Sequence, residues 1–276
     1  MTLTPHPSPE QSEQSEQAEQ AEQELQVSRD GSGVVTVTLN RPRTKNAVTG
    51  AGWVAIADVF DDIAGRADDR VVILTGAGGN FCSGADLSAR GGVSPREGMR
   101  RVNRASAAVR DLPKPTIAVV SGVAVGAGFN LALACDLAIA ERSARFSQIF
   151  SLRGLSVDFG GTWQLPHNVS LQRAKELAFF GRMYGADEIA AFGLLNRVVD
   201  DGDALPVAEE WALELTRIAP TALSQTKELL NAAAASTFDE ALSREAIAQN
   251  FNGTTADTRE AIDAFLQKRE PRFGGN

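Results

Sequence analysis

The stretch PKPTIAVVSGVAVGAGFNLALACDLAIA, residues 113–140, contains the pattern that decides the fold. It opens with a short apolar run, TIAVV (116–120), passes through a turn rich in Gly and Ala, and continues as small and apolar residues over 126–134. A second apolar run, DLAIA (136–140), follows. Short, wholly apolar strands with a helix between them are typical of parallel sheets that are covered on both faces. This stretch therefore predicts an α/β fold.

The same alternation extends toward the N-terminus. GVVTVTLNRP (33–42) is a β-branched run that stops at a proline, and RVVILTGAGG (70–79) is a short apolar run that ends at glycines. Both are predicted to be strands. Apolar residues recur at helical spacing over 49–66 and again over 97–111. Strands and helices are thus expected to alternate through the first two thirds of the chain.

Helices dominate the sequence beyond residue 168. The predicted helices cover 171–180, 186–193, 205–218, 221–234, 238–249 and 256–268. At the other end, SPEQSEQSEQAEQAEQE (8–24) has almost no apolar side chains, so it cannot contribute to a core. We therefore expect three parts, which are a disordered Glu/Gln-rich tail at 1–29, a strand-rich core with the functional site at 30–200, and a helical region for oligomerisation at 201–276.

The charge balance argues against a nucleic-acid partner. The 276 residues have a formal net charge of -8, but six of the acidic residues lie in 1–25, where there is no Lys or Arg. The remaining body is close to neutral and has no basic surplus of the kind that nucleic-acid binding needs.

Cysteine, histidine and hydropathy narrow the possibilities further. The two cysteines, Cys82 and Cys135, cannot form a disulfide framework, which suits a reducing cytoplasm. His167 is the one histidine outside the tail, so catalytic triads and His-rich metal sites are disfavoured, and it is expected to be a partly buried or capping residue. No apolar stretch reaches the length of a membrane span, and the N-terminus is unlike a signal peptide. We expect a cytoplasmic protein with no membrane partner.

Two glycine-rich turns follow predicted strands, GNFCSGADLS (79–88) and SGVAVGAGFNLALACD (121–136). Gly and Ala at such junctions let backbone N–H groups approach a ligand closely. A helix that begins behind the second turn would direct its N–H groups toward negative charge. Two such turns facing each other would form an oxyanion hole, although either turn alone is more often structural.

The ordered motifs of the whole body resemble the crotonase (enoyl-CoA hydratase/isomerase) superfamily. The segments that carry the resemblance are LNRPRTKNAV (39–48), VVILTGAGGNFCSGADL (71–87), residues 113–140, FSQIFSLRGLSVDFGGTWQLP (146–166), GADEIAAFGLLNRVVD (185–200) and AFLQKREPRF (264–273). The resemblance implies a crotonase-like spiral of ββα repeats with a C-terminal helical extension. It also implies a homotrimer or hexamer that binds acyl-CoA thioesters.

The resemblance also implies which groups bind the thioester. Its oxygen would be held by the backbone N–H groups of Ala85 and Ala127, which lie in turns that contain Gly84 and Gly128. Drawing charge onto that oxygen acidifies the α-carbon and stabilises the enolate that forms. Coenzyme A enters as part of the substrate, and no metal or redox cofactor is implied.

The coenzyme site is expected in the same region, with one departure from the family. It would border Asp86 and Leu87, although Asp86 matches a family position that looks structural. The lysine that often follows is replaced by Ser88. The remaining candidates for the phosphates are Arg43, Lys45 and, for a neighbouring subunit, Lys268, with ordinary surface charge as the alternative interpretation.

The hydratases of this family use two glutamates to activate water, and this sequence has neither. The corresponding residues are Asn130 and Phe150, which we expect to line the substrate site. An amide can hold a water molecule but does not exchange its proton near neutral pH, and a phenyl ring can do neither.

One acid remains, Asp158, at a place where several family isomerases have theirs. A single carboxylate can remove a proton from one carbon and return it two carbons away, which moves a double bond. Its apolar neighbours Phe150, Val157 and Phe159 are expected to raise its pKa. The alternatives are a helix cap or turn residue at Asp158, a hydratase or other enolate reaction without the usual glutamates, and a non-catalytic acyl-CoA-binding subunit.

Overall fold

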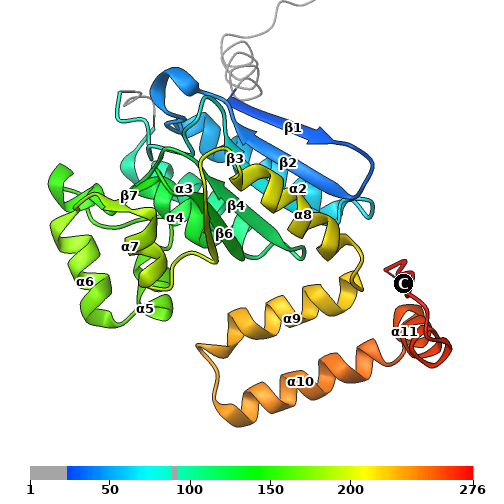
Figure 1. Cartoon of the computed structure of the whole chain (residues 1–276). Coiled ribbons are helices and arrows are strands. Elements are labelled where there is room, and N and C mark those ends of the chain that lie inside the picture. The colour runs from blue at the N-terminus through cyan, green and yellow to red at the C-terminus, as the bar shows by residue number, and fades with distance from the viewer. Residues whose placement is uncertain (1–23, 89–92, 276) are drawn as a thin grey trace, which may run out of the picture.

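Six strands form the main sheet of the computed structural model, which describes residues 24–88 and 93–275 (Figure 1). In spatial order they are β1 (Leu25–Arg29), β2 (Val34–Leu39), β3 (Val71–Gly76), β4 (Thr116–Val120), β6 (Leu137–Glu141) and β9 (Arg197–Val199). All neighbouring pairs are parallel except β1 and β2. The four apolar runs of the sequence are β2, β3, β4 and β6, so the predicted parallel sheet is confirmed.

A smaller second sheet supplies the other half of each repeat. It consists of β5 (Val123–Val125), β7 (Arg145–Ser147) and β8 (Tyr184–Gly185), in that order. Two isolated bridges, Cys82 to Ala124 and Val48 to Ala85, extend it toward the earlier repeats. Each repeat therefore places one strand in the large sheet and one extended segment in the small sheet, and then enters a helix. This arrangement confirms the predicted spiral of ββα units.

The helices begin where the sequence offers a cap. The structure has α2 (Gly50–Gly65), α3 (Pro95–Arg110), α4 (Ala127–Ala134), α5 (Gly161–Asn168), α6 (Leu171–Phe180), α7 (Ala186–Ala191), α8 (Ala204–Thr216), α9 (Pro220–Ala233), α10 (Phe238–Asn252) and α11 (Ala256–Gln267), with 3₁₀ turns η1 (Pro42–Thr44) and η2 (Ile149–Arg153). The side chains of Thr49, Ser94, Ser170, Thr237 and Thr255 each accept a hydrogen bond from the first turn of the helix that follows. Helix α5 was not predicted, because it is short and contains Pro166.

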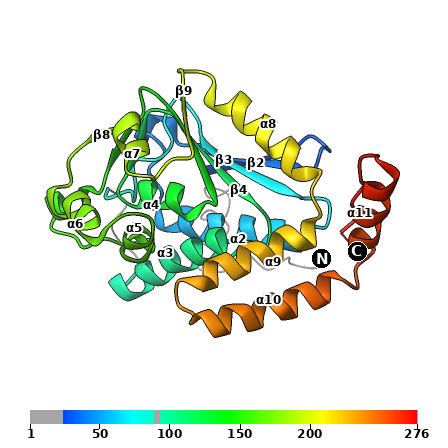
Figure 2. The same ribbon diagram turned by 60° about the horizontal axis from the view of Figure 1, so that its bottom comes forward.

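Helices cover both faces of the main sheet (Figure 2). On one face α8 packs through three fully buried alanines, Ala204, Ala208 and Ala212, against β3, β4 and β6. Small side chains let this helix approach the sheet closely. On the other face α2, α3 and α4 bury large side chains such as Phe60 and Phe129. Helix α4 of this layer begins directly after the second glycine-rich turn.

Two sequence predictions need correction. Residues 25–29 were assigned to the disordered tail, but they form β1, which pairs antiparallel with β2 from Leu25 opposite Leu39 to Arg29 opposite Val35. The local pattern missed it because Leu25 is the one buried residue of the strand. The prediction of disorder for 1–23 lies outside the described residues. His167 is exposed, so the prediction of partial burial is wrong; it stacks on Trp163 at 4.0 Å, and its ring hydrogen-bonds the Trp163 carbonyl within α5.

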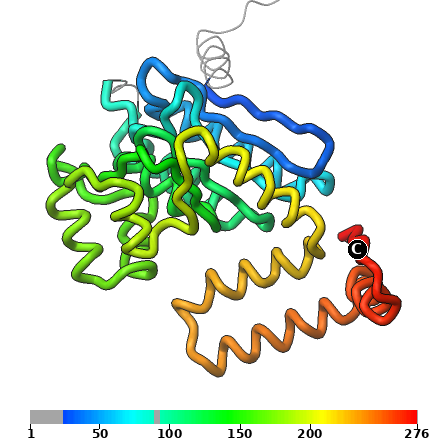
Figure 3. The backbone as a smooth tube through the Cα atoms, viewed as in Figure 1, coloured from blue at the N-terminus to red at the C-terminus, as the bar shows by residue number. Residues whose placement is uncertain are grey.

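The last three helices form an arm (Figure 3), which α9 attaches to the core through the ion pair of Lys227 with Asp136 at 2.8 Å. Neither α9 nor α10 has a buried residue. The large apolar side chains that this arm exposes are Leu230, Phe238, Leu242, Ile247, Phe251, Ile262, Phe265 and Leu266. Exposed apolar surface is characteristic of interaction sites where such side chains form a large patch. In the described part of the chain, no helix is long and apolar enough to cross a membrane.

Candidate active site

The two glycine-rich turns of the sequence lie against each other in the structure. The segment after β3 runs beside β5, where Cys82 donates its N–H to Val123 O at 2.9 Å and accepts from Val125 N at 3.0 Å. Helix α4 begins immediately after β5, and a Cβ atom at Gly128 would lie only 2.4 Å from the Cys82 carbonyl oxygen. Glycine at 128 is therefore needed for this close approach.

Ala85 and Ala127 lie next to this contact between the two turns. A Cβ atom at Gly84 would lie 2.8 Å from Val125 O and 3.6 Å from Ala127 N, so the two turns touch. Gly126, the N-cap of α4, has φ 57° and ψ -125°, a conformation that L residues rarely adopt. Among the described residues, neither the Ala85 nor the Ala127 N–H donates to an acceptor. Two free donors at adjoining turns, one at a helix N-terminus, can together hold an oxygen that gains negative charge.

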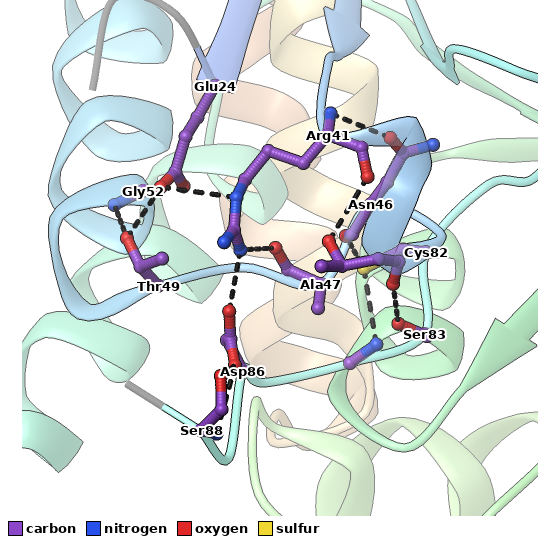
Figure 4. A network of polar contacts seen from close by, with 12 residues as sticks. Glu24, Arg41, Asn46, Ala47, Thr49, Gly52, Cys82, Ser83, Asp86 and Ser88 are labelled. Carbon is purple, nitrogen blue, oxygen red and sulfur yellow. Dashed lines mark hydrogen bonds and ion pairs between the residues drawn. The ribbon is translucent and has the colours of Figure 1, made fainter. Parts of the chain in front are cut away.

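A network of hydrogen bonds and ion pairs around Arg41 and Asp86 holds the segment that contains Ala85 in place (Figure 4). Arg41 donates to Ala47 O at 2.6 Å and to the Asp86 carboxylate at 2.8 Å, and its Nε lies 3.6 Å from Glu24. The Ser88 hydroxyl donates to the other Asp86 oxygen at 2.6 Å. These hydrogen bonds, that of Ser88 first and then that of Arg41, lower the pKa of Asp86. Asp86 is therefore held by protein groups and stabilises the turn, whereas a coenzyme contact was predicted for it.

Sequence reasoning missed most of this network. Thr49 donates its hydroxyl to Glu24 at 2.9 Å while capping α2, and the buried Asn46 donates to Ala77 O and Asn80 O. Arg41 and Asn46 lie in the motif at 39–48, so their place in that motif was the available signal. Glu24 gave no local signal, because it ends a Glu/Gln repeat whose other acids look the same.

The residues predicted to bind the coenzyme are distributed unevenly. Arg43 and Lys45 are exposed on the loop that contacts the Ala85 segment, where Ser83 N donates to Lys45 O at 2.9 Å. Leu87 is exposed in the same area. Lys268 caps the C-terminal end of α11. Since α11 stands apart from the core in Figures 1 and 2, the structure does not bring Lys268 to the site of its own chain.

Asp158 is linked to α4 by the hydrogen bond of its backbone carbonyl with Asn130, and its carboxylate has no hydrogen bond or ion pair among the described residues. Within the described chain its buried Oδ1 has no hydrogen-bond partner. Burial raises its pKa to about 6, in the direction that the apolar neighbours predicted. The N-cap of α5 is Gly160, and no side chain caps this helix. The interpretation of Asp158 as a helix cap is therefore wrong, whereas its interpretation as a turn residue is confirmed, because its carbonyl accepts from Gly161 N at 3.0 Å.

Asn130 connects Asp158 with the first turn of α4, and Phe150 lies beside the glycine that precedes this helix. The Asn130 amide is fully buried, donates to Asp158 O at 2.8 Å, and accepts from Gln148 Nε2 at 2.7 Å. A Cβ atom at Gly126 would lie 3.7 Å from the Phe150 ring. The structure thus brings both residues to the site. The contacts of Asn130 are with the protein, where a substrate contact was predicted.

The comparisons with known proteins agree with this architecture. The sequence pattern that describes the enoyl-CoA hydratase/isomerase family matches residues 29–276. The 1,2-epoxyphenylacetyl-CoA isomerase of Escherichia coli is 38% identical over 91% of this chain and 99% of its own length. A probable enoyl-CoA hydratase of Rhodobacter capsulatus is also 38% identical, over 88% of this chain and 95% of its own.

Solved structures of the same kind are similar throughout. An enoyl-CoA hydratase from Bacillus anthracis superposes with a TM-score of 0.88 at 33% identity, covering 92% of this chain and 100% of its own. The resemblance seen in the sequence motifs is thereby confirmed. The chain belongs to the enoyl-CoA hydratase/isomerase family.

Proposed function

We propose that this protein is an acyl-CoA isomerase that shifts a double bond, with Asp158 as the proton shuttle and the Ala85 and Ala127 N–H groups as the oxyanion hole. The observation that carries the proposal is the state of Asp158. Its carboxylate is partly buried and unpaired, and its pKa is raised to about 6. It is attached through Asn130 to the helix that begins at Ala127. A carboxylate with a pKa near the working pH is suited to take up and return a proton.

The proposed reaction balances with one acid. The Asp158 carboxylate removes a proton from C2 of a 3-enoyl thioester, and the electron pair moves onto the thioester oxygen to give a dienolate. The two N–H groups hold that oxygen, an interaction that is typically worth about 3–4 kcal/mol of barrier per donor. Protonated Asp158 then delivers the proton to C4, and the double bond ends between C2 and C3. Only a proton moves, so no metal or redox cofactor is required.

The side chains near Asp158 favour isomerisation over hydration. Addition of water needs groups that exchange protons with it, and the residues at the two hydratase positions are the amide Asn130 and the ring Phe150. Gln148, the polar partner of Asn130, is also an amide. The names of the relatives include both reactions, so a hydratase and a non-catalytic acyl-CoA-binding subunit remain the outcomes against which the proposal is tested.

The coenzyme and the assembly belong to the same proposal. We infer that the phosphates of coenzyme A lie near Arg43 and Lys45, which are exposed next to the Ala85 segment. The apolar face of α9–α11 favours a homotrimer or hexamer, in which Lys268 would reach a neighbouring subunit's site. The assembly would be measured by light scattering on the eluted peak of a sizing column.

The experiment that tests the reaction supplies the wild-type protein with 3-enoyl-CoA and 2-enoyl-CoA thioesters separately. Formation of the conjugated 2-enoyl thioester from the 3-enoyl substrate is the expected result, followed by its ultraviolet absorbance. Efficient hydration of the 2-enoyl ester without isomerisation would overturn the proposal. Binding of both esters without turnover would overturn it in favour of a non-catalytic subunit.

A further inference from the structure

Asn130 lies between the proposed oxyanion donor Ala127 and the proposed acid Asp158. It lies on α4, three residues after Ala127, and its backbone N–H donates to Gly126 O at 3.1 Å. Its side chain, fully buried, reaches across to Asp158 O at 2.8 Å. A single turn of helix therefore separates one proposed oxyanion donor from the residue that contacts the backbone of the proposed acid.

The Asp158 turn needs such support. The Asp158 carbonyl also accepts from Gly161 N at 3.0 Å, and the two residues between them, Phe159 and Gly160, have φ values of 52° and 75°. A positive φ is routine for glycine but disfavoured for phenylalanine, so surrounding contacts must maintain the turn.

Contacts from two other helices hold the same turn. The Phe159 ring is fully buried with its centroid 5.2 Å from that of Trp53 in α2, and the Phe159 carbonyl accepts from the Ser106 hydroxyl of α3 at 3.1 Å. Asn130 of α4 and Ser106 of α3 thus bind the backbone of the turn and Trp53 of α2 packs on its Phe159 ring, while the buried Oδ1 of Asp158 has no partner among the described residues. This is the arrangement expected where a reactive group must be held without being neutralised.

The chemistry of the amide determines which residue can serve at position 130. A carbonyl oxygen only accepts, so the group that faces Asp158 O must be a donor, and the Asn130 Oδ1 atom is fixed by Gln148 Nε2 at 2.7 Å. An ionised carboxylate at 130 has no proton to donate and would face the carbonyl oxygen as a second acceptor. The space is also closed, since a Cβ atom at Gly161 would lie 2.3 Å from Asn130 Nδ2.

From these contacts we propose that Asn130 is a positioning residue, oriented by Gln148, that locks the Asp158 turn onto the oxyanion helix. The inference rests on the proposed isomerase function. Asparagine stands at position 130 where the hydratases of the family have a glutamate, and its amide supplies the N–H donor that holds the turn of the proposed acid. A neutral amide does this without adding a charge near the carboxylate, whose pKa is raised by burial with no charged side chain of the described residues contributing.

The test compares Asn130→Ala and Asn130→Asp with Asn168→Asp as the matched control. Asn168 is exposed and donates to Gln164 O at 2.8 Å within α5, away from Asp158. We expect kcat on 3-enoyl-CoA to fall about 30- to 300-fold in both Asn130 variants with KM changed less than about threefold, since a positioning defect raises the barrier more than it weakens binding. The control should keep wild-type values. Ser106→Ala should also reduce kcat, but by less, because the contacts of Asn130 and Trp53 with the turn remain.

A second readout does not depend on activity. The Asp158 carboxyl would be titrated by ¹³C NMR in wild type and Asn130→Ala, with Asp158→Asn used to assign its signal and circular dichroism used to check folding. Opening of the turn to water should lower the pKa of Asp158 from about 6 toward its ordinary value. An Asn130→Ala protein that folds, keeps kcat and keeps the raised pKa would overturn the inference. A wild type without isomerase activity would instead count against the proposed function, and the titration would still decide the role of Asn130.

Discussion

Two aspartates of this molecule lie in segments that each contact α4 or the turn before it, and their environments are opposite. Asp86 is paired with Arg41 and Ser88, and these contacts lower its pKa. Asp158 has no partner for its buried oxygen, and burial raises its pKa to about 6. In the Asp86 turn the charge stabilises the structure. In the Asp158 turn neutral groups stabilise the structure, and the charge is left available for chemistry.

Breaking the charge network of the Asp86 turn should have the largest effect on stability. Arg41→Met leaves the Asp86 carboxylate, whose side chain is 8% exposed, without its cation. We expect the free energy of unfolding to fall by about 2–4 kcal/mol, because an unpaired buried charge is costly. Urea denaturation measures the change. Arg43→Met in the same exposed loop is the control and should stay within about 0.5 kcal/mol of wild type.

Removing the other charge should act in the opposite direction. The native pKa of Asp158, about 6, lies above the unfolded value, so the free energy of unfolding of the wild type falls as pH rises from about 4 to about 6. Asp158→Asn removes this cost and should raise the free energy of unfolding at pH 7 by about 1–2 kcal/mol, with allowance for solvent screening. The gain should vanish near pH 4.

The matched variant in the other turn sharpens the comparison. Asp86→Asn should be less stable than wild type at pH 7, because the lowered pKa of Asp86 means that its charge stabilises the fold above the unfolded pKa. Denaturation curves of both variants at pH 4 and pH 7 provide the measurement. Equal and same-signed effects at the two aspartates would show that their environments do not differ as described.

The pH dependence of the activity should also follow the ionisation of Asp158. If the ionised form of Asp158 removes the substrate proton, kcat/KM for 3-enoyl-CoA falls tenfold per pH unit below an apparent pKa of about 6 and is constant above it. Initial rates in a series of buffers from pH 5 to pH 8 at constant ionic strength test this. A profile that is flat across this range would contradict the assignment of Asp158 as the base.

The coenzyme contacts should show the smallest effect. Lys45→Ala should raise KM for a CoA thioester about fivefold, since an exposed charge pair is worth up to about 1 kcal/mol. A pantetheine thioester, which lacks the nucleotide phosphates, should be unaffected by the same change. Lys175→Ala, at an exposed position on α6, is the control. An equal loss with both thioesters would mean that Lys45 acts on the loop and does not contact the phosphates.

The parts of the fold that have local patterns were predictable. The apolar strands and the capped helices follow from runs and spacings within a few residues, and the predicted α6 over 171–180 matches the structure. The very short strands β5, β7 and β9 were not predicted, because three residues give too little pattern to distinguish a strand from a turn. β1 was missed for another reason, since its pairing with β2 buries only one of its side chains.

For the candidate site too, features that depend on neighbours along the chain could be predicted, and contacts between distant segments could not. The raised pKa of Asp158 could be predicted from its apolar neighbours along the chain and is confirmed. The residues that hold its turn could not, because Asn130 and Ser106 are far from it in sequence and approach it only through the packing of α3 and α4. The same holds for Glu24, which the fold brings to Thr49 and Arg41. Contacts across such separations leave no spacing in a single sequence.

The measurement that tests the account most directly is the rate of conversion of 3-enoyl-CoA to 2-enoyl-CoA by Asp158→Asn beside wild type, on protein whose folding has been checked. The account predicts a folded variant that binds the thioester and converts it about 10²- to 10⁴-fold more slowly, the usual contribution of a general acid–base group. A variant that isomerises at the wild-type rate would contradict the central claim that Asp158 carries the proton.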